Sequence, residues 1–344
     1  MRKIEKFVKQ NKIKFVDVVF LDLYGTTRQI TIPTNKLADA LDYGLKCDGS
    51  SVNYSNKIED SDTRLILDET SYFLLPDNKL MVFCFTDNTY DARKNLFNLQ
   101  TDLSQNNTKI NFGAELEFFL FKQANGQVDL NNSDNLKYFN QITGDYSNCL
   151  NDICNFCADK INLEALHHEC GRNQFEIDWK YDTPLKTADN VVFLKRVIRF
   201  FAEKYGFRAC FMPKPLNGVS GSGMHLNISI FKGEQNLFYD KNDTNNLSEF
   251  AYKFVKNIFN HISAITAFAN PLVNSYKRLN TGFETPTQVN YSSTNRSALV
   301  RIPKASPKQI PHTIAFNNHS IQNPPIQNII FILQLNPLYL YQIF

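Results

Sequence analysis

Hydrophobic and polar residues alternate in the first part of the chain with the period of β-strands. The alternation covers residues 14–32 and 60–86, with turns expected at Tyr24-Gly25 and at Pro76-Asp77-Asn78. A short helix is expected from Asn35 to Tyr43, and another within the polar stretch 87–111. Residues 1–105 are therefore predicted to form a small N-terminal domain built mainly on a sheet.

The middle of the chain combines strands with longer helices. A strand, GAELEFFLF, opens at Gly113, and apolar residues spaced three and four apart predict helices over residues 151–166, 187–205 and 247–268. Strands with polar faces lie between these helices. The elements do not alternate as βα units, so the fold class expected for the second domain, residues 106–308, is α+β.

The last part of the chain has a different composition. No Asp or Glu follows Glu284, and beyond Lys308 the chain is rich in Asn, Gln, Ile and Pro. The final sixteen residues, IIFILQLNPLYLYQIF, carry no charge. A shifted reading frame or a truncated gene would produce such a sequence, so residues 309–344 are interpreted as an aberrant tail.

The overall composition argues against several classes of protein. Hydrophobic residues make up 43% and charged residues 21% of the chain, as in ordinary globular proteins. The net charge of +3 is too small to indicate binding to nucleic acid or to a membrane surface. No stretch reaches the roughly 18 apolar residues of a membrane span, and the N-terminus does not read as a signal peptide. Seven cysteines without framework spacing indicate a reducing compartment, so a cytoplasmic protein is expected.

Four glutamates are candidates for metal ligands. Glu115 and Glu117 lie two apart in a strand-like run, so both project from one face of the sheet. In HHECGRNQFEIDW, a two-residue turn at Arg172-Asn173 would place Glu169 directly opposite Glu176. Like charges in this position destabilise a hairpin unless a cation lies between them, which favours Mg²⁺ or Mn²⁺. A solvated acidic hairpin or sheet edge is the alternative interpretation.

Two further segments carry groups suited to phosphate and carboxylate chemistry. In GVSGSGMHLNISI, the strand places His225, Asn227 and Ser229 on one face, where His225 is either a metal ligand or a hydrogen-bonded sheet residue. The glycine loop before it lacks the Gly-Lys-Ser/Thr ending of a P-loop. Downstream, NSYKRLNTGFETP and NRSALVRIP supply arginines, which suit bidentate recognition of carboxylate and phosphate oxygens; a basic solvated loop is the alternative.

Taken together, these segments resemble the glutamine synthetase family of the bacterial class I type. The resemblance rests on CDGSS at residues 47–51, GAELEFFLF, HHECGRNQFEID, FMPKPLNGVSGSGMH, NSYKRLNTGFETP and NRSALVRIP, in the family's order. It implies a small N-terminal β-grasp domain followed by a catalytic domain with an antiparallel sheet backed by helices. It also implies that ammonia is joined to the γ-carboxylate of L-glutamate with ATP, through a γ-glutamyl phosphate.

The resemblance implies two metal sites. Glu117, Glu169 and Glu176 match ligands of a first metal, Mg²⁺ or Mn²⁺, which touches glutamate and helps to bind ammonia. Glu115 and His225 match ligands of a second metal, which holds the ATP phosphates.

The resemblance also implies roles in catalysis and substrate binding. The matching residues are Asp48, which helps to deprotonate ammonium in a neighbouring subunit's site, Gly221 of the glutamate-binding loop, Arg278 at the glutamate carboxylate, the flap residue Glu284, Arg296 and Arg301 at the transferring phosphates, Ser229 at the nucleotide, and Tyr146 at the ammonium site. The family stacks rings of six subunits into dodecamers, so a homo-oligomer is the expected assembly.

The sequence departs from the family after RIPKASP. The family continues there with an Arg-x-Glu-x-Arg strand that completes the second metal site, whereas this chain reads QIPHTIAF, without an acid or an arginine. A missing ligand leaves neighbouring charges mispaired, so the chain is expected to have little biosynthetic activity. Two alternatives stay open: a catalytically impaired family member with a binding or regulatory role, and a ligase that joins glutamate to an amine.

Overall fold

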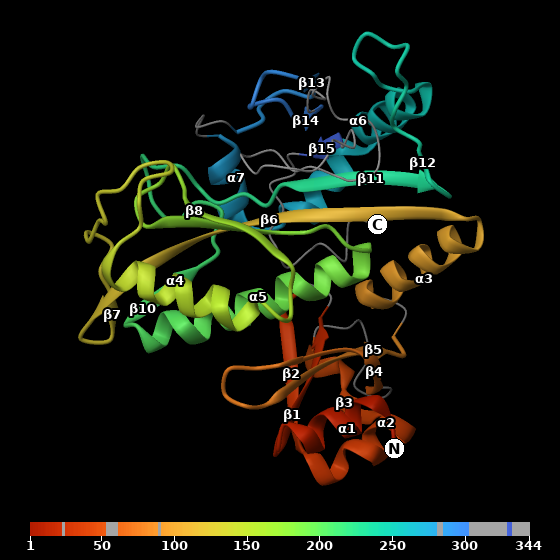
Figure 1. The fold of residues 1–344 in the computed structure, drawn as a ribbon, viewed down its shortest axis with the longest axis vertical. Helices are drawn as coiled ribbons and strands as arrows, with labels where there is room; N and C mark the ends of the chain where they lie inside the picture. Colours follow the sequence, from red (N-terminus) through yellow and green to blue (C-terminus); the bar gives the residue numbers. More distant parts are fainter. Residues whose placement is uncertain (23–24, 53–60, 89–90, 281–284, 303–328, 332–344) are drawn as a thin grey trace.

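A computed structural model of the protein describes residues 1–22, 25–52, 61–88, 91–280, 285–302 and 329–331. Figure 1 shows a smaller N-terminal unit below a larger unit that is built around a long sheet. No helix among the described residues is long and apolar enough to cross a membrane.

The N-terminal unit is a five-stranded sheet accompanied by two helices. Its elements are α1 (Lys3–Gln10), β1 (Phe15–Leu21), β2 (Thr27–Pro33), α2 (Leu37–Tyr43), β3 (Leu45–Asp48), β4 (Asp62–Leu74) and β5 (Leu80–Thr86). The strand order is β2-β1-β5-β4-β3, with β1 and β5 parallel and the other pairs antiparallel. The predicted strands on either side of the turn at Pro76-Asp77-Asn78 are present.

Strand β1 contributes to two hydrophobic cores. Successive side chains of a strand point to opposite faces of its sheet. Val16, Val18 and Phe20 pack in the core of the N-terminal unit, whereas Val19 and Leu21 pack in the core of the larger unit. The strand is therefore apolar on both faces, and the two units share a packed interface.

The larger unit has a ten-stranded sheet that is covered by helices. Its elements are α3 (Ala92–Gln105), β6 (Thr108–Ala124), β7 (Gln127–Val128), α4 (Gly144–Cys157), β8 (Leu163–His168), β9 (Gln174–Trp179), α5 (Pro184–Lys204), β10 (Phe207–Cys210), β11 (Leu226–Lys232), β12 (Gln235–Asn236), α6 (Glu249–Ala269), α7 (Val273–Leu279), β13 (Tyr291–Ser292), β14 (Val300–Arg301) and β15 (Ile329–Phe331). The main order is β13-β14-β15-β11-β6-β9-β8. Figure 1 shows α4 and α5 on the side of this sheet that faces the N-terminal unit.

The long strand β6 organises the larger sheet. It pairs antiparallel with β11 along its first part, with β9 in the middle and with β10 near its end. The chain segments that carry the candidate site residues therefore converge on one strand, although they lie far apart in the sequence.

One predicted helix has the wrong bounds. The helix expected over residues 151–166 is α4, which begins at Gly144 and ends at Cys157, and β8 follows at Leu163. Ile153, Cys157 and Ile161 are all buried in the same core, so the four-residue spacing continues past the end of the helix. Pairing with β9, which the spacing does not reveal, makes the next residues a strand.

The structure describes three residues of the predicted tail. Strand β15 lies between β11 and β14 in the larger sheet. The remainder of residues 309–344 lies outside the described part of the chain, so its interpretation as an aberrant tail stays a prediction.

Candidate active site

Strands β6 and β9 bring four carboxylates together on one face of the sheet. In their antiparallel register, Glu115 lies opposite Asp178 and Glu117 lies opposite Glu176. Glu117 is 7% exposed and Glu176 is 6% exposed. Like charges that oppose each other directly across a sheet repel, and burial removes the water that would screen them. We call this group, together with Glu169, the carboxylate cluster.

The hairpin between β8 and β9 has a different register from the predicted one. Glu176 pairs with His167, and the amide of Glu169 donates to the carbonyl of Gln174 at 2.8 Å. The prediction that Glu169 lies directly opposite Glu176 is therefore wrong. The turn comprises residues 170–173 rather than two residues.

Local hydrogen bonds explain the wider turn. The amide of Gly171 donates to Oε1 of Gln174 at 2.9 Å, and the carbonyl of Gly171 accepts from the amide of Gln174 at 3.1 Å. Asn173 has a φ of 60°, a left-handed conformation that asparagine adopts more readily than most residues. The glutamine side chain thus closes a turn that sequence spacing alone did not indicate.

Glu169 and Glu176 still lie close together, around the ring of His167. The predicted and observed registers differ by an even number of residues, and only an odd shift moves a side chain to the other face. Nδ1 of His167 lies 3.7 Å from Oε1 of Glu169, and Nε2 lies 3.4 Å from Oε1 of Glu176. Ligand atoms of the three residues all lie within 4.8 Å of one another, a spacing suited to a shared metal ion.

Strand β11 adds polar groups on the other side of β6. Nδ1 of His225 lies 2.7 Å from Oε2 of Glu115, and Nδ2 of Asn227 donates to Oε1 of Glu115 at 3.0 Å. Farther along the strand, the hydroxyl of Ser229 accepts a hydrogen bond from Nδ2 of Asn111 at 3.3 Å. His225 is thus a direct neighbour of the carboxylate cluster through Glu115.

The buried carboxylates raise one another's pKa values. Burial and the charge of Glu169 raise the pKa of Glu117 to about 8. Burial, and then the charges of Asp178 and the other carboxylates, raise the pKa of Glu176 well above its usual range. Burial and the charge of Glu115 do the same to the pKa of Asp178. Fully ionised, the cluster would hold more negative charge than the nearby cationic side chains neutralise, so its carboxyls keep their protons to a higher pH.

Glu115 and His225 form the one internally balanced pair of this group. Burial opposes ionisation of Glu115, but the hydrogen bond and charge of His225 outweigh it and lower the pKa of the carboxyl. Burial would also lower the pKa of His225, yet the hydrogen bond and charge of Glu115 raise it to about 8. An imidazolium therefore sits where the sequence predicts a metal ligand.

These residues fit divalent cations that prefer oxygen ligands. Three glutamates that repel one another, Glu117, Glu169 and Glu176, present carboxylate oxygens, which Mg²⁺ and Mn²⁺ favour. Nε2 of His167 and Oδ1 of Asp178 are buried, and neither has a hydrogen-bond partner in the described part of the chain. A bound cation would neutralise the cluster.

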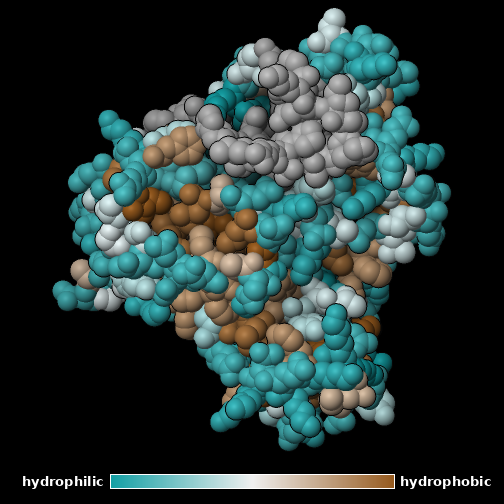
Figure 2. Space-filling view, viewed as in Figure 1, coloured by the Kyte–Doolittle hydropathy of each residue, from teal (hydrophilic) through white to brown (hydrophobic). Residues whose placement is uncertain are grey.

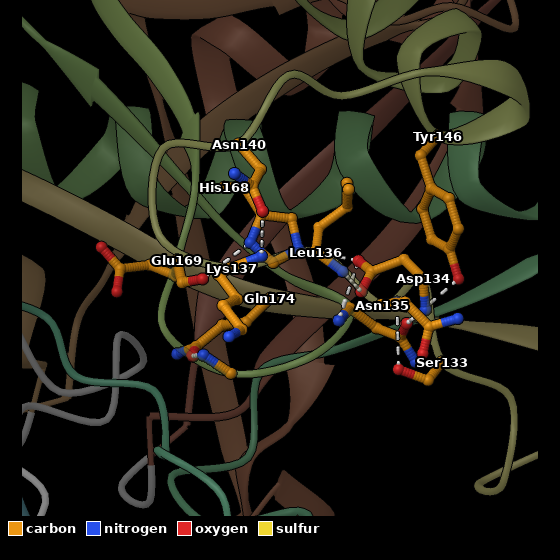
Figure 3. A network of polar contacts seen from close by, with 12 residues as sticks. Ser133, Asp134, Asn135, Leu136, Lys137, Asn140, Tyr146, His168, Glu169 and Gln174 are labelled. Carbon is orange, nitrogen blue, oxygen red and sulfur yellow. Dashed lines mark hydrogen bonds and ion pairs between the residues drawn. The ribbon is translucent and has the colours of Figure 1, made fainter.

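A polar network behind the turn positions two residues of the site. Nε2 of His168 lies 2.7 Å from Oδ2 of Asp134, and its Nδ1 lies 2.6 Å from the carbonyl oxygen of Glu169. Figure 3 shows this network, with Gln174 close to the backbone of Glu169. Nε2 of Gln174 donates to Oε2 of Glu117 at 2.9 Å. The fully buried His168 therefore links the loop that carries Asp134 to the carboxylate cluster.

The glycine loop approaches Arg278 of α7 closely. A Cβ atom on Gly221 would lie 2.1 Å from the carbonyl oxygen of Pro213 and 2.4 Å from Cδ of Arg278, so only glycine fits. The carbonyl of Gly221 accepts from Nε2 of Gln174 at 3.2 Å. The charge of Arg278 partly offsets the raised pKa of Glu117. Gly221 and Arg278, two of the three predicted substrate-binding residues, thus lie beside the cluster, and the third is Arg296.

Two more predicted arginines lie near the cluster, and one of them contacts a tyrosine that sequence reasoning missed. The charge of Arg301, at the end of β14, contributes to the lowered pKa of Glu115. Arg296 donates a hydrogen bond to the hydroxyl of Tyr138, and the charge of Glu169 acts on the same hydroxyl. Tyr138 is therefore close both to a predicted phosphate-binding arginine and to the carboxylate cluster.

Comparison with known proteins decides which family this arrangement represents. The family model described as "Glutamine synthetase, beta-Grasp domain" matches residues 12–89, and the model described as "Glutamine synthetase, catalytic domain" matches residues 89–312. A curated glutamine synthetase from Clostridium saccharobutylicum is 37% identical over 316 residues, which cover 88% of this chain and 71% of that protein. The chain belongs to the glutamine synthetase family.

Solved structures agree with this membership of the glutamine synthetase family. A ligand-free structure of GmaS has a TM-score of 0.83 and 26% identity, covering 99% of this chain and 78% of the other. A cryo-electron microscopy structure of Plasmodium falciparum glutamine synthetase has a TM-score of 0.82 and 26% identity, covering 99% of this chain and 72% of the other. The predicted fold, α+β with an N-terminal β-grasp domain, is confirmed. The protein is a ligase of this family.

Of two further residues predicted from the family resemblance, one lies away from the cluster and the other lies outside the described chain. Asp48 ends β3 in the N-terminal domain, which Figure 1 shows well apart from β6 and β11. It is exposed, and hydrogen bonds from the hydroxyls of Ser50 and Ser51 lower the pKa of its carboxyl. Glu284 lies outside the described residues, so its role stays a prediction.

The role predicted for Tyr146 at the ammonium site stays a prediction. Tyr146 is buried in the hydrophobic core, where its ring packs on Phe175 and Phe207 and its hydroxyl lies 3.3 Å from Oδ1 of Asn173. Tyr138 instead lies beside the carboxylates, in an irregular loop where no periodicity could have indicated it.

Asp178 is a second residue of the site that was not predicted, although the alternation of side chains along a strand indicates it. Asp178 follows Glu176 by two positions in a strand, so the alternation rule places both on the same face. The same rule found Glu115 and Glu117, and its full application would have added Asp178 to the candidates.

Proposed function

We propose that this protein is a glutamine synthetase in the strict sense: it joins ammonia to the γ-carboxylate of L-glutamate, with ATP, through a γ-glutamyl phosphate. The observation that supports this most directly is the buried carboxylate cluster of β6 and β9, whose charge is not balanced by protein groups. Phosphoryl transfer between anionic reactants needs divalent cations at the phosphates, and such a cluster can hold them.

The metal ligands follow from the geometry of the cluster. Glu117, Glu169 and Glu176 would hold one Mg²⁺ or Mn²⁺, and Glu115 with His225, once the imidazole has lost its proton, would hold another. When bound, these cations neutralise phosphoryl oxygens and polarise the phosphorus toward attack. The protein's own residues fix where this happens.

Cationic side chains are assigned to the anionic parts of the substrates. Arg278, beside Gly221, binds the glutamate carboxylate, because a guanidinium offers two parallel donors to a carboxylate. Arg296 and Arg301 contact the phosphates and stabilise the charge that develops as the phosphoryl group moves. Ser229 on β11 contacts the nucleotide. Arg278 and Arg301 already act electrostatically on cluster carboxylates.

The acyl phosphate must be kept from water, because it would otherwise hydrolyse before ammonia arrives. We assign this task to a flap that carries Glu284. Ammonia then attacks the acyl carbon, the bond to the phosphate oxygen breaks, and inorganic phosphate leaves with the electron pair.

Ammonium must lose a proton before its nitrogen can attack. We assign this step to Asp48 of a neighbouring subunit, because Asp48 is exposed on the N-terminal sheet and is held ionised by the hydroxyls of Ser50 and Ser51. The site is then complete only in a homo-oligomer, for which we propose a dodecamer. Figure 2 shows a hydrophobic area in the middle of one face of the molecule, which is typical of a surface that packs against another chain.

We place this enzyme in the cytoplasm. All seven cysteines are free thiols in the structure, which fits a reducing compartment.

The proposed reaction is tested by measuring phosphate release from ATP. The assay contains Mg²⁺, L-glutamate and either ammonium or methylamine, and compares the wild-type protein with Glu117→Gln. The variant keeps the shape of the side chain and removes the charge, so it controls for contaminating ATPase. We expect release that needs both glutamate and ammonium and that disappears in the variant.

Each other result selects a different function. Faster release with methylamine than with ammonium would make the protein a ligase that joins glutamate to an amine. Release in wild type no faster than in Glu117→Gln, with either nitrogen donor, would refute catalysis and favour a binding or regulatory role. A slow rate that Glu117→Gln still abolishes would agree with the low activity predicted from QIPHTIAF.

A further inference from the structure

A cavity lies between the N-terminal sheet and helix α5. Its volume is about 150 Å³, and it shares no lining residue with the carboxylate cluster. Figure 1 shows β1 and β2 rising from the N-terminal domain toward α5. The polar lining comes from Asp17, Thr27 and Gln29 of these strands and from Lys195, Arg196 and Arg199 of α5. Both domains therefore contribute to one polar cavity.

Lys195 is buried in the wall of this cavity without an opposing charge. It is 2% exposed, and in the described part of the chain its ammonium has neither an ion pair nor a hydrogen-bond acceptor. The ammonium lies over the face of the Phe211 ring, whose centre is 4.8 Å from Nζ. An ammonium that is largely removed from bulk water and has no acceptor in the protein is unfavourable, so its position in the cavity wall suits an anion.

The one carboxylate of the lining is already engaged. Oδ2 of Asp17 lies 3.2 Å from Arg196 and 4.0 Å from Lys79, and its Oδ1 accepts from the hydroxyl of Thr31 at 2.6 Å. Arg196 also donates to Oε1 of Gln29 at 2.8 Å. Asp17 therefore leaves no negative charge for the other cations of α5.

Arg199 adds a second cation to the same wall. Its guanidinium lies over the ring of Phe211, 5.1 Å from the ring centre. The ammonium of Lys195 lies over the same ring. The charge of Glu203, on the next turn of the helix, favours the protonated form of Arg199. However, Oε1 of Glu203 forms an ion pair with Nη1 of Arg208 at 3.6 Å. The cationic charge that faces the cavity thus exceeds the anionic charge.

The protonation of Lys195 reflects this imbalance. Burial, and then the charge of Arg199, lower its pKa to about 7. An anion in the cavity would reverse both effects and restore a full ammonium.

We propose that this cavity is a binding site for a small oxyanion, a phosphate or a carboxylate group, held by Lys195, Arg196 and Arg199. Two guanidinium groups and an ammonium suit such oxygens, because each hydrogen bond is then between opposite charges. The cavity is many times larger than a single water needs. Because both domains line it, a bound anion ties the β-grasp sheet to α5. The proposal does not depend on which reaction the carboxylate cluster performs.

The site is tested by thermal unfolding of the full chain in increasing sodium phosphate or sodium malonate, with sodium chloride at matched ionic strength as the reference. The variant is Lys195→Met, which keeps the length of the side chain and removes the charge. The control is Lys204→Met, an exposed lysine on the same helix that pairs with Asp152 at 2.8 Å. Anions that bind at the carboxylate cluster affect all three proteins equally, so differences between them report on the cavity.

We expect one of the two anions to stabilise wild type and Lys204→Met beyond chloride, and the better anion identifies the group. Lys195→Met should unfold at a higher temperature than wild type without anion, because it removes an unpaired buried charge, and should bind the anion at least about tenfold more weakly. Equal responses in wild type and Lys195→Met, or no response beyond chloride in wild type, would overturn the proposal. If Lys195→Met does not fold, Arg199→Gln must show the same loss of response.

Discussion

Two regions of this protein bury charged side chains: in one, opposite charges are paired, and in the other, like charges lie next to one another. Between the domains, Arg93 of α3 donates from Nε and Nη2 to the two oxygens of Asp189 at 3.0 and 2.8 Å, and from Nη2 to Asp68 at 2.7 Å. The hydroxyl of Ser71 donates to Asp189 at 2.6 Å. At this interface, each of the two carboxylates forms a direct ion pair with the buried cation, an arrangement that we call matched.

The carboxylate cluster shows the reverse arrangement. Glu117 and Glu176 face each other across β6 and β9, and the charges with the largest effect on their pKa values are those of further carboxylates. The contrast appears in the pKa values: Arg93 helps to lower the pKa of Asp68 against the effect of burial, whereas the pKa of Glu117 is raised to about 8. Matched buried charge serves the fold, and unmatched buried charge indicates a missing ligand.

The largest effect is expected from breaking the matched region. Arg93→Met leaves Asp189 and Asp68 buried without their cation, so it should lower the free energy of unfolding by about 3–5 kcal/mol. Lys46→Met removes a cation from an exposed pair with Asp62, and it should change the free energy of unfolding by less than about 1 kcal/mol. Chemical denaturation at pH 7 measures both. Similar values for the two variants would contradict the distinction between buried matched and exposed pairs.

The unmatched region should respond to mutation in activity rather than in stability. Glu117→Gln resembles the protonated carboxyl that the metal-free site already favours at pH 7, so the free energy of unfolding without metal should stay constant or rise. Loss of a metal ligand should lower kcat/KM more than about 100-fold, beyond the usual effect of an outer-shell partner. Steady-state kinetics with Mg²⁺ test the expected loss of kcat/KM, and denaturation in EDTA tests the expected stability without metal. Marked destabilisation of the metal-free variant would mean that Glu117 serves the fold.

A smaller effect is expected from pH and metal removal. The pKa of Glu117 rises from 4.5 to about 8, so the folded state binds an extra proton between these values, and stability falls as pH increases through that range. The pKa of His225 rises from 6.5 to about 8, so its stabilising contribution is also lost as pH rises through 8. In EDTA, the two groups together should lower the free energy of unfolding by about 3 kcal/mol between pH 6.5 and 8.5.

Excess Mg²⁺ supplies the matched control for this measurement, because it should hold the carboxylates ionised and remove most of the fall. The Arg93 network contributes no slope in this range, since the pKa of Asp68 is lowered and its contribution is lost only in acid. A fall of the same size with and without Mg²⁺ would show that the metal does not bind at the cluster.

Sequence alone predicted which side chains share a strand face. Alternation placed Glu115 with Glu117, because successive residues of a strand point to opposite sides whatever the strand pairs with. In the same way it placed His225 and Asn227 together, and both contact Glu115. These statements needed only the local period of the backbone.

Tertiary structure decided which faces meet. The opposition of Glu117 and Glu176, the contact of His225 with Glu115, and the turn closed by Gln174 each depend on partners far along the chain or on side-chain hydrogen bonds. The burial of Lys195 in a cavity wall likewise depends on the packing of α5 against the N-terminal sheet. Local periodicity sets the direction of a side chain, but strand register and domain packing set its neighbours, and the chemistry of this protein lies in those neighbours.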